Sequence, residues 1–255
     1  MRDVIPTGMS RDSEFLFERM AEATFAPLGA QAGRRVLDVA TGIGQDAASV
    51  AGSGAFVVGI EPSGRMTDLA RLAASERKGP RSHFVRGWGD VLPFASGSFD
   101  AVFCKGSIDH FDEPRQALSE MARVTAADGR VVVAIANFDS LACRLSRAWD
   151  ELREVWLRQP LPAGRRLYDV PHDHFTRYEL GLMLEQVGEV LELERVEGVS
   201  LGWGMPGWSG LLGRMPDTVA GTALHGLDWL ARGMPWFADV VVLSGRPRRS
   251  AIASA

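Results

Sequence analysis

Two carboxylates and a glycine turn have the residue types and spacing of a site for a small charged ligand. Asp38 closes a short apolar run, Gly42 and Gly44 follow it, and residues 45–50 are typical of a helix. Glycines in such a turn let a ligand approach main-chain N–H groups without interference from Cβ. A second apolar run ends in Glu61. Because buried parallel strands end at the same edge of a sheet, both carboxylates are predicted to face one ligand.

The chemistry of these carboxylates favours one cofactor over another. The spacing Gly42-x-Gly44-x-x-Ala47 also fits the loose dinucleotide fingerprint, so the turn alone admits a nicotinamide cofactor. Asp38 would repel a pyrophosphate, but it suits the ammonium of a methionine moiety. Glu61 can accept hydrogen bonds from both hydroxyls of a ribose. The combination favours S-adenosylmethionine, and an oxidoreductase remains the alternative.

An acid/base pair follows the fourth predicted strand. Asp109 and His110 lie just after it, where ligands bind in doubly wound sheets. An imidazole beside a carboxylate can take a proton near neutral pH, which suits an alcohol, phenol or acid substrate. The alternative is that His110 caps or packs against the following helix. Asp109 and His110 are therefore candidate catalytic residues.

Further ionisable groups gather between residues 168 and 174. His172 and His174 with two aspartates could form a metal site, but no third ligand at zinc-like spacing accompanies them, so no metal is expected. These histidines are expected to project from a lid loop toward a substrate or to cap the helix that Phe175-Thr176 is predicted to open. Tyr168 is expected to shape the same pocket.

A Gly- and Trp-rich hairpin of helices is predicted over residues 202–237. It has too many large apolar residues for an exposed connection, among them Trp203 and Trp208. They are expected to pack on the sheet and on the helix at Trp149, or to line an apolar substrate cavity. A homodimer face or a membrane-surface face is a third interpretation. Trp203 and Trp208 are the substrate-binding candidates.

Composition narrows the function classes. The 255 residues are 46% hydrophobic and carry a formal net charge of -4, which is enough apolar material for a large core and argues against a nucleic-acid partner. Two cysteines make no disulfide framework and suit a reducing cytosol. We find no signal-peptide pattern at the start and no run near the ~20 apolar residues of a membrane span. A soluble cytoplasmic protein is expected.

Apolar strands alternate with helices along the chain, which predicts an α/β protein with a doubly wound parallel sheet. We expect one domain over residues 1–255, divided into an N-terminal helical lid (1–32), a cofactor-binding core (33–137), a helical insertion with a lid loop (138–188), and the last strands with their helical insertion (189–255). The strands are predicted at residues 35–38, 57–61, 83–87, 101–104, 130–136, 190–199 and 238–243, and a long helix at 140–159.

Several motifs carry a family resemblance between residues 36 and 188. Leu92-Pro93-Phe94 precedes Gly97-Ser98-Phe99-Asp100, and Asp112-Glu113-Pro114 begins a helix that leads to Asp128-Gly129-Arg130. Together with the glycine turn, these resemble class I S-adenosylmethionine-dependent methyltransferases, in particular the small-molecule group related to quinone-biosynthesis methyltransferases. The resemblance implies a Rossmann-like, mostly parallel seven-stranded sheet with an antiparallel last strand and helical insertions.

The resemblance also assigns cofactor contacts. It implies that Asp38, Gly42 and Gly44 contact the methionine end and Glu61 the ribose. Pro62 would border the adenine, and Lys105 would face the cofactor through its backbone.

Two positions depart from the family pattern. Ala40 occupies the first glycine position of the usual Gly-x-Gly-x-Gly, and Trp88 stands where many relatives place an aspartate near the adenine amino group. We interpret Trp88 as stacking beside the adenine, with Gly89 offering its backbone and Asp90 reaching the amino group. The alternative is a core tryptophan at a strand end.

The sequence thus predicts transfer of a methyl group from S-adenosylmethionine to a small, partly apolar molecule, with oxygen the favoured acceptor atom. With a carbon or nitrogen acceptor, Asp109 and His110 would only orient the substrate. A cofactor-binding protein without transferase activity is a further alternative.

Overall fold

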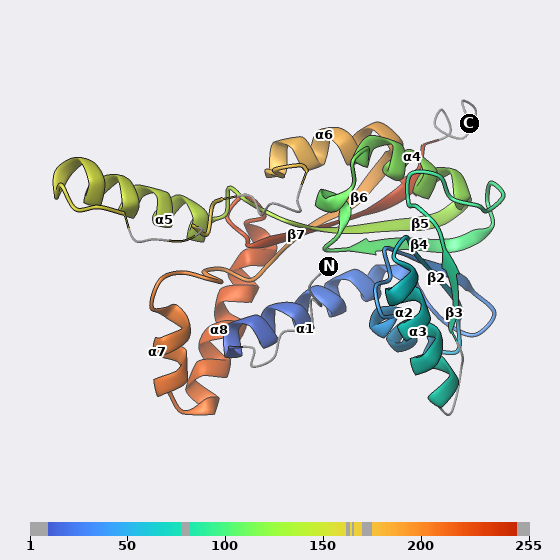
Figure 1. Ribbon diagram of the computed structural model, residues 1–255, viewed down its shortest axis with the longest axis horizontal. Coiled ribbons are helices and arrows are strands. Elements are labelled where there is room, and N and C mark those ends of the chain that lie inside the picture. Colours follow the sequence, from blue (N-terminus) through green and yellow to red (C-terminus); the bar gives the residue numbers. More distant parts are fainter. Residues whose placement is uncertain (1–9, 78–81, 162–163, 165, 170–174, 249–255) are drawn as a thin grey trace.

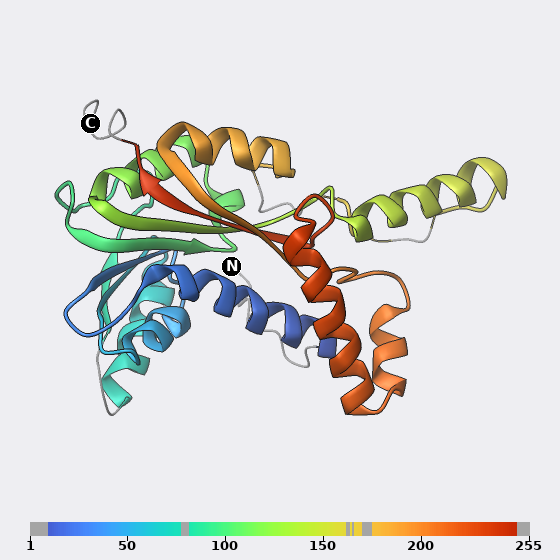
Figure 2. The same ribbon diagram turned by 180° about the vertical axis from the view of Figure 1, so that it is seen from behind.

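A seven-stranded sheet lies between two layers of helices (Figures 1 and 2). The computed structural model describes residues 10–77, 82–161, 164, 166–169 and 175–248. Within them the strand order is β3-β2-β1-β4-β5-β7-β6. The strands are β1 (Arg35–Val39), β2 (Phe56–Glu61), β3 (Ser82–Arg86), β4 (Phe99–Lys105), β5 (Thr125–Ala136), β6 (Leu191–Val199) and β7 (Val240–Pro247). Only β7 runs antiparallel to its neighbours, β5 and β6, so the predicted fold class is confirmed.

The helices divide between the two faces of the sheet. The helices are α1 (Arg11–Phe25), α2 (Gln45–Ala51), α3 (Gly64–Glu76), α4 (Pro114–Val124), α5 (Leu141–Glu151), α6 (Leu180–Val190), α7 (Trp208–Arg214) and α8 (Asp217–Gly233), with short η1 (Ala26–Leu28), η2 (Ile108–His110) and π-helical η3 (Leu152–Trp156). Figure 1 shows α4 and α6 on one face, and α1, α2 and α3 on the other, with α8 beyond α1.

Alternation along each strand fills both layers. In β4, Val102 and Cys104 belong to the core under α4 and α6, whereas Ala101 and Phe103 belong to the core under α1 and α2. Successive side chains of a strand point to opposite faces, so an unbroken apolar strand feeds two cores. This leaves the ends of the strands as the places where polar side chains can gather.

One predicted helix start is wrong. Phe175-Thr176 was expected to open the helix that follows the lid loop, but α6 begins at Leu180. The backbone N–H groups of Phe175 and Thr176 donate instead to the carbonyl of Asp109, at 2.8 and 3.3 Å. Phe138 N–H also donates to the carbonyl of Tyr178 at 2.9 Å. These tertiary bonds hold residues 175–178 extended against η2.

The predicted hairpin of helices over residues 202–237 is present as α7 and α8, but it does not cover the long helix at Trp149. Figure 1 shows α5 projecting from the body, and Trp149 is 51% exposed. The hairpin meets only the base of α5, where Leu141 N–H donates to the Phe237 carbonyl at 2.9 Å. Across the described residues, no helix is both long and apolar enough to cross a bilayer.

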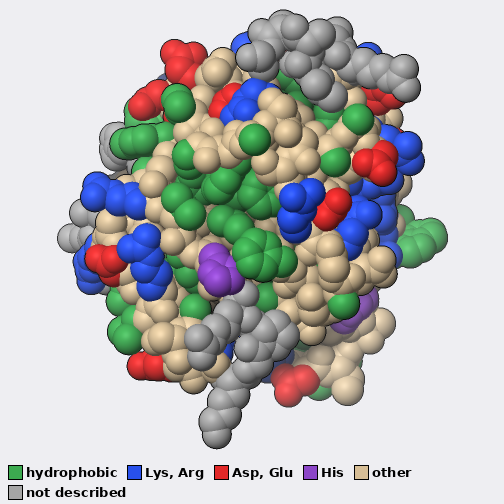
Figure 3. Space-filling view, turned by 90° about the vertical axis from the view of Figure 1, so that its right-hand side faces the viewer, with side chains coloured by type: hydrophobic (Ala, Val, Ile, Leu, Met, Phe, Trp, Pro, Cys, Tyr) green, Lys and Arg blue, Asp and Glu red, His purple; other side chains and the backbone are tan. Residues whose placement is uncertain are grey.

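Figure 3 views the edge of the sheet at which the parallel strands begin, and hydrophobic side chains gather at its centre. Phe56, at the start of β2, is 49% exposed and stacks on His83 with 4.9 Å between ring centroids. The predicted carboxylates lie at the opposite, carboxyl edge. The apolar patch at this edge is therefore separate from the candidate site.

Candidate functional site

The turn between β1 and α2 has no room for a side chain at Gly44. Gly44 has φ +77°, and a Cβ there would lie 2.4 Å from Cζ of Phe84. Ala40 also has a positive φ, +60°, in a region that L-residues other than glycine rarely adopt. The first glycine position of the family pattern thus keeps its left-handed backbone in this chain although alanine fills it.

Glu61 ties this turn to the end of β2. Its Oε2 accepts from the Gly42 amide at 3.1 Å, and its Oε1 accepts from the Ser63 amide at 3.0 Å. The side chain is only 8% exposed. A carboxylate oxygen carries two lone-pair sites, so each oxygen can accept one more hydrogen bond. Glu61 therefore both fixes the turn and retains acceptor capacity at the carboxyl edge.

Asp38 lies beneath the same turn in a cluster of two carboxyl groups and one ammonium. It is 2% exposed, and its Oδ2 accepts from Oγ1 of Thr41 at 2.6 Å. Asp46, in the first turn of α2, pairs with Nζ of Lys105 at 3.0 Å. Burial raises the pKa of Asp38 well above its usual range, and the charge of Asp46 adds to this, while Thr41 and Lys105 oppose it. The cluster holds two carboxylates but one ammonium.

The loop after β3 borders the turn on its other side. Trp88 is 65% exposed, so the alternative of a core tryptophan is wrong. Gly89 is buried, and a Cβ there would lie 2.3 Å from Cε1 of Phe111, which follows η2. Asp90 and Pro62 are both half-buried. The loop thus presents a solvent-facing indole and a closely packed glycine beside the end of β2.

Asp109 and His110 leave β4 in different environments. Asp109 is 2% exposed, and its charge adds to the burial that raises the pKa values of Cys104 and Tyr178. His110 is exposed. Both belong to η2, at the carboxyl edge that Asp38 and Glu61 also reach. Tyr178, which follows this region in the chain, is a fully buried core residue whose hydroxyl donates to Oε1 of Gln186 at 2.7 Å.

The loop expected to cover the substrate is only partly described. Tyr168 donates to Oδ2 of Asp150 at 3.0 Å, and the guanidinium of Arg147 lies over its ring, so Tyr168 packs on α5. His172 and His174 lie outside the described residues. Among the described residues, no cluster of three or more His, Cys, Asp or Glu side chains could hold a metal ion.

Both tail tryptophans lie against α1. Trp203 donates from Nε1 to Oγ of Ser13 at 3.1 Å, and its backbone N–H donates to Oδ2 of Asp239 at 2.9 Å. Trp208 packs on the cluster of Phe15 and Leu212. The segment that carries Trp203 and Trp208 therefore packs against the first turns of α1.

Two further candidate residues, Asp46 and Asp239, were not predicted from the sequence. Asp46 looks like an acidic residue placed for the helix dipole, and only the fold brings it to Lys105. Asp239 precedes an apolar strand and carries no local signal. In the structure it is 6% exposed, burial raises its pKa to about 7, and it holds the loop of Trp203.

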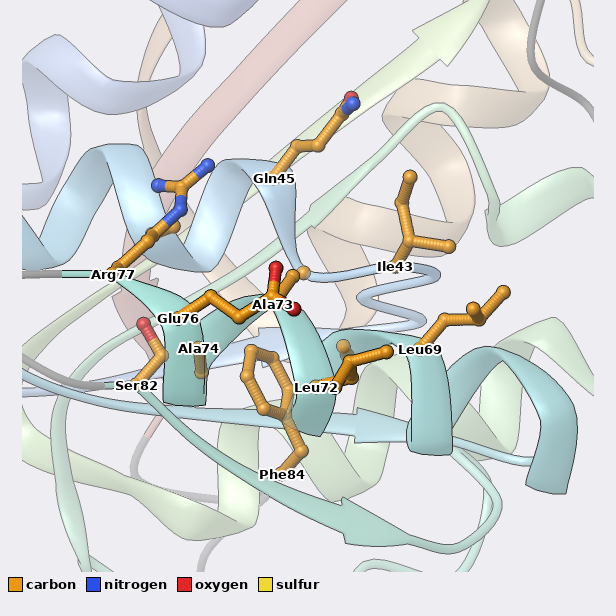
Figure 4. A pocket seen from close by; sticks show the side chains of 13 residues that line it. Ile43, Gln45, Leu69, Leu72, Ala73, Ala74, Glu76, Arg77, Ser82 and Phe84 are labelled. Atoms are coloured by element: carbon orange, nitrogen blue, oxygen red, sulfur yellow. The ribbon is translucent and has the colours of Figure 1, made fainter.

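A groove between α2 and α3 lies near this region but is distinct from it. Figure 4 shows its apolar lining, which includes Ile43, Leu69, Leu72 and Phe84. Ile43 and Gly44 of the turn, and Gln45 at the start of α2, line this groove. None of the carboxylates described above lines it. The chemistry of the carboxyl edge, rather than this groove, defines the candidate site.

Residues 37–133 match the family model described as "Methyltransferase domain". This part of the chain is a methyltransferase domain. The match agrees with the class I S-adenosylmethionine-dependent methyltransferases that the motifs resemble. The matched residues contain the glycine turn, both carboxylates and the Asp109–His110 pair, so the domain and the candidate site coincide.

Curated relatives and solved structures agree with this domain. The chain is 42% identical over 132 residues to a demethylmenaquinone methyltransferase of Beutenbergia cavernae, covering 52% of this chain and 50% of that protein. It is 37% identical over 132 residues to the one of Renibacterium salmoninarum, covering 52% and 51%. The chain thus spans about half the length of these relatives. The YcgJ structure from Bacillus subtilis has a TM-score of 0.57 at 19% identity, covers 91% of this chain and 99% of that one, and shares the fold.

Proposed function

We propose that this protein transfers a methyl group from S-adenosylmethionine to a small, partly apolar molecule, with oxygen as the acceptor atom. The methyltransferase domain and the names of the relatives support methyl transfer to small molecules. One of these relatives, 29% identical over 161 residues and covering 62% of this chain and 71% of that protein, is an O-methyltransferase of Aspergillus nomiae. The buried cysteines Cys104 and Cys143 favour a reducing compartment, and we place the reaction in the cytoplasm.

The observation that carries the proposal is the arrangement of two carboxyl groups around one ammonium at the end of β1. Asp38 and Asp46 share one ammonium, that of Lys105, and burial makes the charged form of Asp38 costly. The ammonium of a methionine moiety is the cation that this cluster lacks. A dinucleotide would bring a pyrophosphate, which these carboxylates repel.

The remaining contacts fit the rest of the cofactor. Glu61 retains acceptor capacity for the ribose hydroxyls, and Trp88 offers an exposed ring face on which an adenine can stack. When bound, S-adenosylmethionine supplies an activated methyl group on a sulfonium. The protein then has to bring a nucleophile into line with it and exclude water.

His110 supplies the proton chemistry in this proposal. A hydroxyl nucleophile loses its proton as it attacks the methyl group. His110 is exposed at the carboxyl edge and Asp109 beside it is buried, so an imidazole at this place can take the proton and return it to solvent. A carbon or nitrogen acceptor would leave His110 with an orienting role only.

A thermal-shift panel with S-adenosylmethionine, S-adenosylhomocysteine and NAD tests the proposal. A ligand that binds the native state stabilises it by about 2.7 kcal/mol at one hundred times its Kd. Tm should therefore rise with the concentration of the first two compounds and not with NAD. A rise in Tm with NAD alone would contradict the proposal and favour a nicotinamide-dependent oxidoreductase. No rise with any of the three would remove cofactor binding altogether.

If S-adenosylhomocysteine binds, turnover is the next test. Release of S-adenosylhomocysteine from S-adenosylmethionine should depend on an added hydroxyl-bearing acceptor. Binding without turnover across a broad panel of hydroxyl, amine and carbon acceptors would favour a cofactor-binding protein without transferase activity.

A further inference from the structure

The part of α1 between Ser13 and Met20 crosses the carboxyl edge of the sheet. Met20 lies beside Gly106, just past β4, because a Cβ at Gly106 would lie 3.0 Å from Cε of Met20. Farther toward the helix start, Ser13 accepts from Nε1 of Trp203, which follows β6. Figure 1 shows α1 running beneath the sheet from α2 toward α7 and α8. Its first two turns therefore border the region beyond the strand ends, where an acceptor molecule would have to lie.

One buried carboxylate, that of Asp12, lies in this part of α1. Asp12 is 3% exposed, and its Oδ1 is buried with no hydrogen-bond partner among the residues that the structure describes. Burying a carboxylate without compensating bonds destabilises a protein. Such a group in a native structure calls for a specific explanation.

Asp228 shows what a structural carboxylate looks like in the same layer. It is fully buried on α8, and its Oδ2 accepts from Nε of Arg19 and from Arg232, each at 2.9 Å. Its Oδ1 accepts from the backbone N–H of Ser200 at 3.2 Å. Asp228 is thus fully used in joining α1, α8 and the end of β6, whereas Oδ1 of Asp12 bonds to none of the described residues.

The helical register places Asp12 toward the site. Asp12, Leu16 and Met20 are spaced by four residues and so share one face of α1. Leu16 and Met20 pack in the core beneath the sheet. Eight residues of helix span ~12 Å, so Asp12 lies about that far along the helix from the contact at Gly106. This is the span of a small two-ring molecule.

An unused donor lies in the seam between α1 and α7. Nε1 of Trp208 is buried with no hydrogen-bond partner among the described residues. The seam is held by Arg11, which donates to the carbonyls of Leu212 and Met215 at 3.0 and 2.9 Å, and by Phe15, which packs with Leu212. Asp12 follows Arg11 and lies one helical turn before Phe15, so this acceptor and the Trp208 donor are both placed at the seam.

We propose that Asp12 is a specificity-determining residue that accepts a hydrogen bond from a hydroxyl of an apolar acceptor molecule, with Trp208 Nε1 donating to the same molecule. This inference rests on the proposed function. A hydroxyl both donates and accepts, so it can meet an acceptor and a donor together, whereas an ammonium can only donate. Sites built to hydrogen-bond a hydroxyl discriminate strongly against analogues that lack it.

The competing explanation is a purely structural role in the helix. Asp12 lies in the first turn of α1, where an acidic side chain gains from the helix dipole. Glu14 lies in the same turn but is exposed. Substituting Glu14 therefore measures the stabilisation by the helix dipole without the cost of burying a carboxylate. The two explanations predict opposite signs for the effect of Asp12→Asn on stability.

Thermal unfolding of three variants decides between them. Because Asp12 is held for a ligand in this proposal, Asp12→Asn should raise Tm of the free protein by about 2–4 °C. Glu14→Gln should leave Tm unchanged or slightly lower it, and Asp228→Asn should lower it because Arg19 and Arg232 lose their partner. A lower Tm for Asp12→Asn would assign it to structure and overturn the proposal.

Ligand selection is tested with matched pairs of naphthols and their methyl ethers, scored by thermal shift in the presence of S-adenosylhomocysteine. The wild type should prefer the naphthols by about tenfold in affinity, and Asp12→Asn and Trp208→Phe should both lose that preference. An equal response to each pair, including no response, would overturn the assignment of the ligand class. Calorimetry with S-adenosylhomocysteine should give the wild-type Kd for Asp12→Asn. If the wild type does not bind S-adenosylhomocysteine, the proposed function is wrong. The direction of the Tm change in Asp12→Asn would still decide whether Asp12 has a structural role.

Discussion

Oε2 of Glu61 accepts a hydrogen bond from the backbone N–H of Gly42 at 3.1 Å, so the carboxylate that ends β2 holds the turn that follows β1. The other oxygen accepts from Ser63, which begins the approach to α3. One side chain thus fixes two loops at the carboxyl edge before any ligand binds. This preorganisation reduces the ordering that ligand binding would otherwise require.

Glu61→Gln should weaken S-adenosylhomocysteine binding by about tenfold to a hundredfold, because hydrogen bonds to charged groups contribute about 1.5–3 kcal/mol. It should also lower Tm, since an amide offers one acceptor oxygen for the Gly42 and Ser63 amides instead of two. Calorimetric titration and thermal unfolding measure the two effects. Glu192→Gln, an exposed position on β6, serves as the control and should change neither. An unchanged Kd for Glu61→Gln would remove Glu61 from the binding site.

Binding of S-adenosylhomocysteine should tighten as the pH rises through the raised pKa of Asp38. Burial, and then the charge of Asp46, hold that pKa well above its usual range in the free protein. The ligand's ammonium prefers the ionised carboxylate, so binding releases a proton from Asp38. Calorimetry below pH 8 in buffers of different ionisation enthalpy measures this proton release.

The control for this effect is Asp38→Asn, which should bind weakly and with no pH dependence in the same range. Equal affinity of the wild type at every pH, with no proton released, would show that the ammonium binds elsewhere.

The stability of the free protein should fall as the pH rises from about 4 to about 7, in part because of Asp239. Burial raises its pKa from 3.8 to about 7 in the native state. Between these values the unfolded chain has lost the proton that the native protein keeps, so the unfolded state binds fewer protons and stability decreases with pH. One such group changes the free energy of unfolding by at most about 1.4 kcal/mol per pH unit.

Denaturant unfolding at several pH values tests this expectation. Asp239→Asn should flatten the slope between pH 4 and 7, whereas Asp68→Asn, at an exposed position on α3, should keep the wild-type slope. If both variants follow the wild type, Asp239 does not titrate in that window.

Local sequence patterns were enough to predict the sheet and the edge at which Asp38 and Glu61 lie. The apolar runs that end in Asp38 and Glu61 became β1 and β2 because buried strands need continuous apolar residues, and their ends meet at one edge. The Gly- and Trp-rich segment between the last two strands was also predicted to form a hairpin of helices, and it forms α7 and α8. These features depend on residues close together in the chain.

What the sequence could not predict depends on contacts between distant segments. The start of α6 is displaced to Leu180 because the carbonyl of Asp109 takes the amides of Phe175 and Thr176. The same holds for Asp239, whose partner is the backbone of Trp203. No pattern within either segment signals such a bond, so only the fold reveals it.

His110→Ala should lower turnover by ~10²–10⁴-fold with any hydroxyl acceptor that supports activity, because a placed base contributes that much to proton removal. His110 is exposed on η2 at the carboxyl edge, next to buried Asp109 and one loop away from Lys105 and the Asp38 cluster. The Kd of S-adenosylhomocysteine should stay at the wild-type value, since the proposed cofactor contacts do not include His110. Steady-state kinetics and calorimetry separate these two quantities.

The pH profile distinguishes a base from a residue that only shapes the pocket. If His110 takes the proton, the wild-type rate should fall as the pH is lowered across the assayed range, and His110→Ala should lose that dependence. A packing role would instead raise KM and leave the profile unchanged, because the proton would still leave by the same route. Wild-type turnover in His110→Ala across this range would eliminate the base role and favour an acceptor that needs only alignment with the methyl donor.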